Sequence, residues 1–145
     1  MTEAGARRAS EPELRTAGPD DIACVLAFWL EAAEPTSTDS ADALAGLLRR
    51  DPDALIVAEA DGNIVGSVIA GWDGWRGSIY RLAVAPDHRR HGLGSVLLRA
   101  AEDRLAGLGV RRSHAIVAGT SARAVAFWQA TDWEHRSEQL RFAKG

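Results

Sequence analysis

The sequence predicts an α/β (α+β) fold with a mixed central sheet and helices on both faces. Three observations support this prediction. The length of 145 residues suits one domain. Helical and strand patterns interleave in the order β-α-α-β-β-β-α-β-α-β, which packs helices against a sheet. Three consecutive strand patterns joined by tight turns predict an antiparallel run in the middle of the chain.

The N-terminal end predicts a flexible tail and then a short strand. Residues 1–11 carry small and charged side chains without periodicity. The folded domain is therefore predicted to span residues 12–145. Its first strand is predicted at Glu13–Thr16.

Two helices follow this strand. The segment Pro19-Asp20-Asp21 opens the first, because either aspartate can cap the helix and complement its positive end. Apolar residues at steps of three and four give that helix one buried face: Ile22, Val25, Leu26 and Trp29. The second helix is predicted over Asp39–Arg50. It ends at Asp51-Pro52, since proline disfavours helix in the residue before it.

An antiparallel run of three strands occupies the middle of the chain. Leu55–Ala60 is apolar and rich in strand-forming residues, and Asp61-Gly62 predicts a two-residue turn. Asn63–Trp72 is the returning strand. Residues 73–77 predict a second tight connection, and Ser78–Val84 is the third strand.

The C-terminal part predicts the longest helix and further alternation. Helical spacing of apolar residues covers Gly94–Leu108, with glycines at the end of the pattern. Ser113–Ala118 predicts a strand and Ser121–Ala130 a helix. Trp133–Phe142 is predicted to supply the last one or two strands.

Composition and charge argue against several classes of protein. The net charge of −3 lacks the basic excess of a nucleic-acid binder. One cysteine, Cys24, permits no intramolecular disulfide, and the four histidines lack metal-ligand spacing. No apolar run reaches the roughly 18 residues that span a bilayer, and no signal core is visible. We therefore expect a cytoplasmic protein with no metal, nucleic-acid or membrane partner.

The main chemical signal is the loop Arg89-Arg90-His91-Gly92-Leu93-Gly94, between a strand and the longest helix. Backbone N–H groups in a first helical turn have no partner within the helix and lie at its positive end. A phosphate is favoured there. Gly92 and Gly94 allow close approach, and Arg89 and Arg90 add cationic donors. A Walker loop and a dinucleotide-binding unit do not fit the flanking residues.

The residues from Tyr80 to Gly94 resemble the central motif of the GNAT N-acetyltransferases. That motif has L-x-V at the end of a strand, then P, then R-x-x-G-x-G, and then a helix. The matching residues here are Leu82-Ala83-Val84, Pro86 and Arg89–Gly94.

Further segments support the resemblance. Ala124–Trp128 and Trp133 fall where the family has its A-x-x-F/L-Tyr and G-Phe elements, and residues 71–77 are similar to a turn of a bacterial subgroup. The order of elements matches from Leu14 to Lys144. The resemblance implies a bacterial acetyltransferase with a single GNAT (acyl-CoA N-acyltransferase) domain.

The resemblance also implies acetyl-CoA as co-substrate. In the family the pyrophosphate rests on glycine-loop amides, here Arg90 to Ser95, and the pantetheine arm pairs with the central strand, here Leu82 to Val84. A backbone N–H of Val84 or its neighbour would polarise the thioester carbonyl. The implied cofactor-binding residues are Leu82, Ala83, Val84, Arg89, Arg90, His91, Gly92, Leu93, Gly94, Ser95, Ser121 and Trp128.

The implied reaction is direct attack of an amine on the thioester in a ternary complex. The family's usual proton donor is a tyrosine, but this chain has Trp128 there, and an indole N–H does not protonate a thiolate. The catalytic acid and base are therefore unassigned. Glu59 and Asp73 are candidates, expected to end strands near the acceptor, with a solvated surface role as the alternative. Tyr80 is a third, expected to share a face with Leu82 as a core or rim residue.

Two functions fit the sequence. The first is an acetyl-CoA-dependent N-acetyltransferase that acts on a small-molecule or peptide amine. The alternative is a non-catalytic GNAT-fold sensor or partner module that binds acyl-CoA, which Trp128 favours. A homodimer is plausible in either case.

Overall fold

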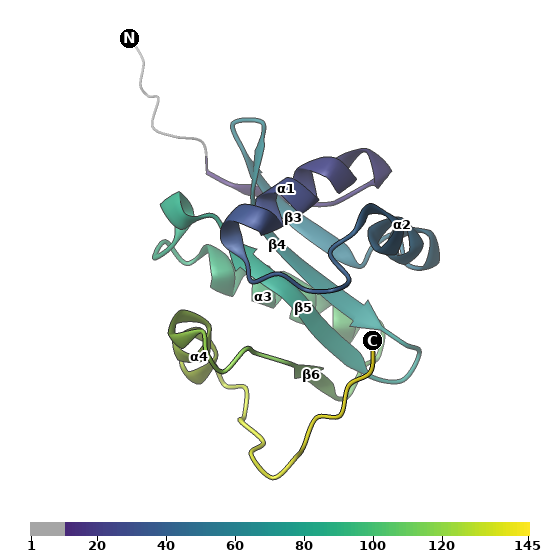
Figure 1. Ribbon diagram of the computed structural model, residues 1–145, viewed down its shortest axis with the longest axis vertical. Coiled ribbons are helices and arrows are strands. Elements are labelled where there is room, and N and C mark those ends of the chain that lie inside the picture. The colour runs from purple at the N-terminus through teal and green to yellow at the C-terminus, as the bar shows by residue number, and fades with distance from the viewer. Residues whose placement is uncertain (1–10) are drawn as a thin grey trace. The chain divides into compact units, whose positions relative to one another are not determined.

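The structure, a computed structural model, describes residues 11–145 (Figure 1). The predicted tail lies outside the described residues, apart from Glu11. The chain divides into two units, of which the first ends at His114 and the second is Ala115–Gly145. Within residues 11–145, no helix is both long and apolar enough to cross a membrane.

A five-stranded sheet of order β2-β3-β4-β5-β6 forms the centre of the fold. Its strands are β2 (Glu13–Thr16), β3 (Leu55–Ala60), β4 (Asn63–Trp72), β5 (Gly77–Val84) and β6 (Ser113–Ala115). The first four strands in this order pair antiparallel with their neighbours. Asp61 and Gly62 have φ of +54° and +81°, as a type I′ turn requires. The predicted hairpin is therefore confirmed with its exact ends.

Three helices of the first unit cover the two faces of the sheet: α1 (Ile22–Ala32), α2 (Ala41–Arg50) and α3 (Leu93–Gly107). Trp29 of α1 donates its indole N–H to Ser67 of β4 at 2.9 Å. Gly66 is the residue before Ser67 and faces α3. A Cβ atom added to Gly66 would lie only 2.8 Å from the side chain of Leu97 in that helix. Neighbouring strand residues point to opposite faces, so α1 and α3 lie on opposite sides of the sheet (Figure 1). The predicted two-faced arrangement is confirmed.

The helix α2 begins later than predicted. Ser40 is its N-cap, and its hydroxyl accepts the N–H of Ala43 at 3.1 Å. Asp39 lies instead in the α1–α2 connection. There its carboxylate accepts hydrogen bonds from the N–H of Thr36 at 3.1 Å and from the hydroxyl of Thr36 at 2.8 Å. The carboxylate of Asp39 is therefore part of a loop and not of a helical turn.

Asp21 fastens the start of α1 to β2. Its carboxylate accepts two guanidinium N–H groups of Arg15, at 2.8 and 2.9 Å, and the backbone N–H of Gly18 at 2.8 Å. Arg15 above all, and then Gly18, lower the pKa of Asp21 from 3.8 to about 2. Pro19–Asp21 forms a separate 3-10 turn before α1. The carboxylate of Asp21 therefore binds the N–H of Gly18 before this turn, and not an N–H of α1.

We expect Asp21 to make the first unit less stable in acid. Because its folded-state pKa lies below the unfolded value, the stabilisation is complete above about pH 4 and is lost as pH falls through about 2. The shift corresponds to about 2 kcal/mol, which solvent screening reduces to about 1 kcal/mol. Urea denaturation at pH 5 and pH 2.5 measures it. Asp21→Asn should lose this part of the pH dependence, and an unchanged dependence in that variant would contradict the assignment.

The second unit, all of which the structure describes, contains one helix, α4 (Ala122–Gln129). Ser121 caps it by accepting the N–H of Ala124 at 3.3 Å. Trp128 packs edge-on against Phe127 and Trp133, with ring centroids 5.6 and 5.0 Å apart. The predicted helix is confirmed, one residue shorter at each end.

The strand predicted before α4 is shorter than expected. β6 ends at Ala115 and not at Ala118. The Ala118 carbonyl accepts the N–H of Ser121 at 3.0 Å, which makes a turn before the helix. The chain therefore leaves the sheet three residues early.

The strand predicted over Trp133–Phe142 is wrong. None of its residues lies in a strand, and the N–H of Gln139 bonds back to the carbonyl of Arg136. Leu140 and Phe142 are 80% and 90% exposed. An alternating pattern makes a strand only where a partner completes the hydrogen-bond ladder, and no described strand pairs with this segment.

Candidate functional site

A β-bulge interrupts β5 inside the motif that the sequence singled out. The register against β4 breaks between Tyr80 and Ala83, where Arg81 and Leu82 together oppose the single residue Val68. Arg81 has φ of +52°, a left-handed conformation that costs a non-glycine residue roughly 1–2 kcal/mol. Bulges and local strain of this kind are concentrated next to functional sites.

Beyond the bulge, Val84 presents its backbone to the edge of β5 that faces away from β4. Ala85 donates its N–H to Val65 of β4 at 2.8 Å. Successive strand residues direct their backbone groups to alternate sides, so the N–H and C=O of Val84 point away from β4. The carbonyl accepts the Nε–H of Arg89 at 3.0 Å. The N–H is directed to the same side as that carbonyl.

The glycine loop leads into unpaired helix amides. Gly92 is the N-cap of α3 with φ of +81°, and no described side chain caps this end. The first intrahelical bond runs from the N–H of Val96 to the carbonyl of Gly92 at 3.1 Å. The N–H groups of Leu93, Gly94 and Ser95 therefore precede the intrahelical ladder. They lie at the positive end of a helix of 15 residues, where an anion is stabilised.

The loop before α3 is open and conformationally specialised. Arg90 has φ of +68° and is a second left-handed residue, two positions before Gly92. Left-handed residues alternating with ordinary ones turn successive N–H groups into an anion-binding concavity. Arg90, His91 and Gly92 are exposed, and a Cβ atom on Gly92 would meet nothing within 4 Å. An anion has free access to these amides.

Two residues of the predicted phosphate loop point inward. Arg89 donates to the carbonyls of Val84, at 3.0 Å, and of Ala32 at the end of α1, at 3.3 Å. Leu93 is 7% exposed, and its Cδ2 atom would lie 3.3 Å from a Cβ on Gly66. The Arg89 guanidinium thus fastens the loop to β5 and α1, and Leu93 offers a ligand only its backbone.

The side chain at the bulge lies beneath α1. Arg81 donates to the carbonyl of Glu34 at 2.8 Å and to the carboxylate of Asp39 at 2.9 Å. Its guanidinium lies 4.8 Å from the ring centroid of Trp29. The side chains of Arg81 and Asp39 are only 12% and 17% exposed. Burial lowers the pKa of Arg81, and Asp39 opposes that shift.

Tyr80 and Leu82 do not share a face of the sheet, so that prediction is wrong. The register places Tyr80 and Ala83 on the α1 face, and Leu82, next to Ala83, on the other. The extra residue of the bulge breaks the simple alternation. Tyr80 is 48% exposed, and its ring lies across Gly71, where a Cβ atom would be 3.3 Å from Cε2. Its phenol stays a candidate proton donor.

The two candidate carboxylates lie at opposite ends of the sheet. Glu59 lies near the β3–β4 turn, and its Oε1 accepts the Nε–H of Arg15 at 2.7 Å. Asp73 follows the far end of β4, and its Oδ1 accepts the N–H groups of Arg76 and Trp75 at 2.7 and 2.8 Å. These N–H groups lower the pKa of Asp73, which makes it a weaker base. Antiparallel pairing separates them, so they do not both lie at one end of the sheet as expected, and a proton-relay role for either one stays a prediction.

The remaining predicted cofactor residues belong to the second unit. Ser121 is the N-cap of α4, and Trp128 lies on the same helix within its aromatic cluster. The bulge and the glycine loop belong to the first unit. Contact of Ser121 and Trp128 with a cofactor stays a prediction.

Sequence reasoning missed the residue that joins α1 to the bulge. Ser67 is fully buried, accepts the indole N–H of Trp29 at 2.9 Å and donates to the carbonyl of Arg81 at 2.7 Å. The available signal was a lone hydroxyl within an apolar strand, because a buried hydroxyl requires partners. The other missed residue, Asp39, was assigned to the start of a helix.

Metal-binding side chains are dispersed over the part of the chain that the structure describes. No group of three or more His, Cys, Asp or Glu residues in it is placed to hold a metal ion. Cys24 is free and exposed on α1, and His114 lies 3.2 Å from the hydroxyl of Ser78.

The bulged strand, the outward amide of Val84 and the glycine loop before α3 lie on one strand–loop–helix segment of the first unit. The acetyltransferase (GNAT) family model matches residues 22–132. An acetyltransferase of Pectobacterium atrosepticum is 33% identical over 124 residues, which are 84% of this chain and 87% of that protein. An acetyltransferase of Sodalis glossinidius is 30% identical over 134 residues, 91% and 94% of the two chains. The chain therefore belongs to the GNAT family.

A solved structure shows the same fold. The N-acetyltransferase PaiA from Thermoplasma acidophilum, in complex with coenzyme A, aligns with a TM-score of 0.73. The alignment covers 83% of this chain and 87% of that one at 16% identity. At this identity the likeness concerns the fold, and the predicted α/β class is confirmed.

Proposed function

We propose that the protein is an acetyl-CoA-dependent N-acetyltransferase that acts on an amine by direct attack. In the ternary complex the amine nitrogen forms a bond to the thioester carbon, the carbon–sulfur bond breaks and the thiolate of coenzyme A leaves. The proton of the amine passes to a base or to water. The observation that supports this best is one strand–loop–helix segment that carries both an outward Val84 amide and an open glycine loop.

The glycine loop supplies binding energy for the cofactor. The N–H groups of Leu93, Gly94 and Ser95 suit the diphosphate of acetyl-CoA, since they need partners and lie at a helix N-terminus. Arg90 and His91 lie on the exposed side of the same loop. This contact is remote from the thioester, so it serves to place the reacting carbon.

The backbone of β5 supplies a hydrogen-bond donor for the thioester carbonyl. A thioester oxygen within hydrogen-bond distance of the Val84 N–H would gain negative charge in the transition state and be stabilised there. Arg89 binds the Val84 carbonyl, which belongs to the next peptide unit, and so restrains the residue whose N–H is the proposed donor. One such fixed donor is worth about 100- to 1,000-fold in rate.

Free thiol release measures the proposed activity. The full chain is incubated with acetyl-CoA and a panel of small amines and peptides, and thiol and amide product are both quantified. Amine-dependent thiol release with matching amide supports the enzyme. Saturable acetyl-CoA binding without amide product from any amine would favour the non-catalytic module instead.

Trp128→Tyr is expected to keep turnover or to raise it. A phenol can donate a proton to the leaving thiolate, which the indole cannot, and general acid catalysis contributes about 100-fold or more where it operates. Trp128→Phe is the packing control, because it keeps a ring against Phe127 and Trp133 without a hydroxyl. A large fall in kcat for Trp128→Tyr, with an unchanged melting temperature, would show that the indole itself is required.

A further inference from the structure

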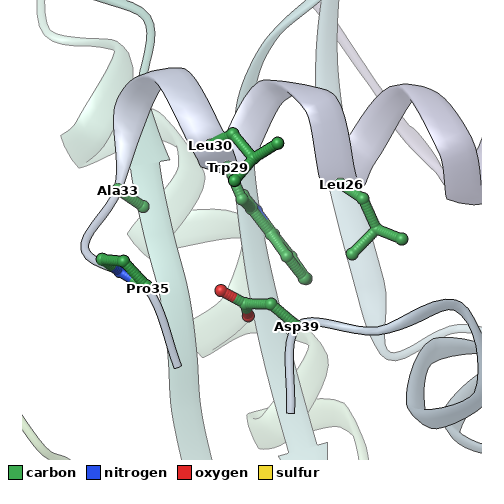
Figure 2. Close-up of a pocket in the computed structure, with 6 residues that line it drawn as sticks. All are labelled: Leu26, Trp29, Leu30, Ala33, Pro35 and Asp39. Carbon is green, nitrogen blue, oxygen red and sulfur yellow. The ribbon is translucent and has the colours of Figure 1, made fainter. Parts of the chain in front are cut away.

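A small pocket opens between α1 and the α1–α2 connection (Figure 2). Its volume is about 110 Å³. Trp29 reaches from α1 toward Asp39 and forms one wall, as Figure 2 shows. The lining residues are otherwise aliphatic: Leu26, Leu30, Ala33 and Pro35. Such a lining favours an apolar occupant.

The one charged residue of this lining is already neutralised. Asp39 is paired with Arg81 at 2.9 Å, and its carboxylate also accepts the N–H and the hydroxyl of Thr36. A carboxylate with three donors has little need of a further cation. The pocket therefore suits the uncharged part of a ligand, and an ammonium group entering it would lose hydration without a free carboxylate among the lining residues.

Hydrogen bonds and a cation–π contact connect the pocket to β5. The Trp29 indole bonds to Ser67, and Ser67 bonds to the carbonyl of Arg81 at the bulge. The Arg81 guanidinium lies over the Trp29 ring and grips Asp39, so it contacts two pocket residues.

A second connection runs through the end of α1. The carbonyl of Ala32, next to Ala33 of the pocket, accepts from Arg89 at 3.3 Å. The same Arg89 holds the carbonyl of Val84 at 3.0 Å. Ala33 of the pocket is thus the chain neighbour of a residue that Arg89 binds, and Arg89 also binds Val84, whose N–H is the proposed donor to the thioester.

We propose that the acceptor is an amine with a small aliphatic group close to its nitrogen, and that this pocket binds the aliphatic group. The proposal rests on the proposed acetyltransferase function and names its substrate class. A cavity of about 150 Å³ lined by apolar residues holds a benzene ring. The volume here therefore suits a group of about three or four carbons, such as isobutyl. Leu30, 85% exposed at the rim, gains a partner when the group binds.

A series of primary alkylamines tests the proposal on the full chain. Methyl-, ethyl-, propyl-, isobutyl- and hexylamine differ little in basicity, so kcat/KM reports recognition of the alkyl group. Each buried methylene is worth about 0.8 kcal/mol, or about fourfold in kcat/KM. We expect kcat/KM to rise up to the four-carbon amine and then to level off or fall. A flat series would overturn the proposal.

Two variants locate the effect in this pocket. Ala33→Leu fills it and should remove the preference for isobutylamine over methylamine, with the KM for acetyl-CoA unchanged. Leu30→Ser should weaken that preference. Leu108→Ser, at the exposed C-terminal end of α3 on the other face of the sheet, is the control and should leave the preference intact. An unchanged preference in Ala33→Leu would overturn the assignment.

The failure of this inference is distinguishable from that of the proposed function. If no amine is acetylated, the proposed function fails, and calorimetry of isobutylamine against the protein saturated with coenzyme A still tests the pocket. Binding that Ala33→Leu abolishes supports the pocket, and equal or absent binding in both proteins overturns it. If all amines react at equal rates, the function stands and the pocket proposal fails.

Discussion

Gly92→Glu is expected to weaken acetyl-CoA binding at least about 100-fold while the protein stays folded. Gly92 is the N-cap of α3, and a side chain there would project beside the unpaired amides of Leu93, Gly94 and Ser95. A carboxylate at that position occupies the anion site from within the chain and repels the diphosphate. Like charges brought together at a binding site cost several kcal/mol, and about 2.7 kcal/mol is a factor of 100. Calorimetric titration with coenzyme A measures the change.

Gly109→Glu is the matched control for this variant. Gly92 and Gly109 share φ of +81°, and a Cβ atom on either would meet nothing within 4 Å. Both variants therefore carry the same backbone strain, roughly 1–2 kcal/mol, and the same added charge. Gly109 lies past the opposite end of a helix about 22 Å long, so its glutamate should leave affinity unchanged. Equal losses in both variants would assign the effect to strain or net charge and not to an anion site.

Local signals in the sequence were sufficient for much of the fold. Asp61-Gly62 has the residue types that a type I′ turn requires, so the β3–β4 hairpin follows from four or five neighbouring residues. The start of α3 is similarly local, because glycines precede the apolar helical pattern; the helix predicted over Gly94–Leu108 lies at Leu93–Gly107, one residue earlier at each end. Such features depend on backbone conformation that few residue types adopt, and they are therefore visible without tertiary knowledge.

The bulge of β5 was not predictable from its own residues. Period-two alternation through Tyr80 and Leu82 gave the wrong face, because the register depends on Ser67 and Trp29, which lie far away in the sequence. The inward orientation of Arg89 is similar, since its partners are carbonyls of α1 and β5. A cationic side chain beside a predicted anion site gives no sign of which neighbour it binds.

The failed strand over residues 133–142 has the same cause. Its alternating pattern was read from side chains alone, yet a strand requires a neighbouring ladder of N–H and C=O groups. Turn bonds such as that from Gln139 to Arg136 satisfy the backbone instead. The strand propensity of these residues was insufficient because no described strand pairs with them. A local sequence pattern cannot indicate whether such a neighbouring strand is present.

Arg81→Met is expected to destabilise the first unit by about 2–4 kcal/mol and to lower turnover. Removal of one member of a largely buried ion pair leaves the other charge without compensation, here the carboxylate of Asp39 at 17% exposure. The variant also loses the bond to the Glu34 carbonyl and the contact over Trp29. Because Arg81 occupies the bulge, its loss releases the strand segment that orients the Val84 amide. Urea denaturation and steady-state kinetics measure the two effects.

A double-mutant cycle separates the ion pair from general loss of packing. Arg81→Met, Asp39→Asn and the double variant should show a coupling free energy of about 1–3 kcal/mol, with the double variant less destabilised than the sum of the singles. Arg99→Met is the control, because its partner Asp103 is 3.4 Å away on the same exposed helix face, and such pairs contribute about 0.5 kcal/mol or less. Additive single effects, or equal losses for Arg81→Met and Arg99→Met, would show that the pair does not fasten the α1–α2 connection to the bulge. The bulge would then depend on Ser67 alone, whose hydroxyl binds the carbonyl of Arg81 whatever side chain that residue carries.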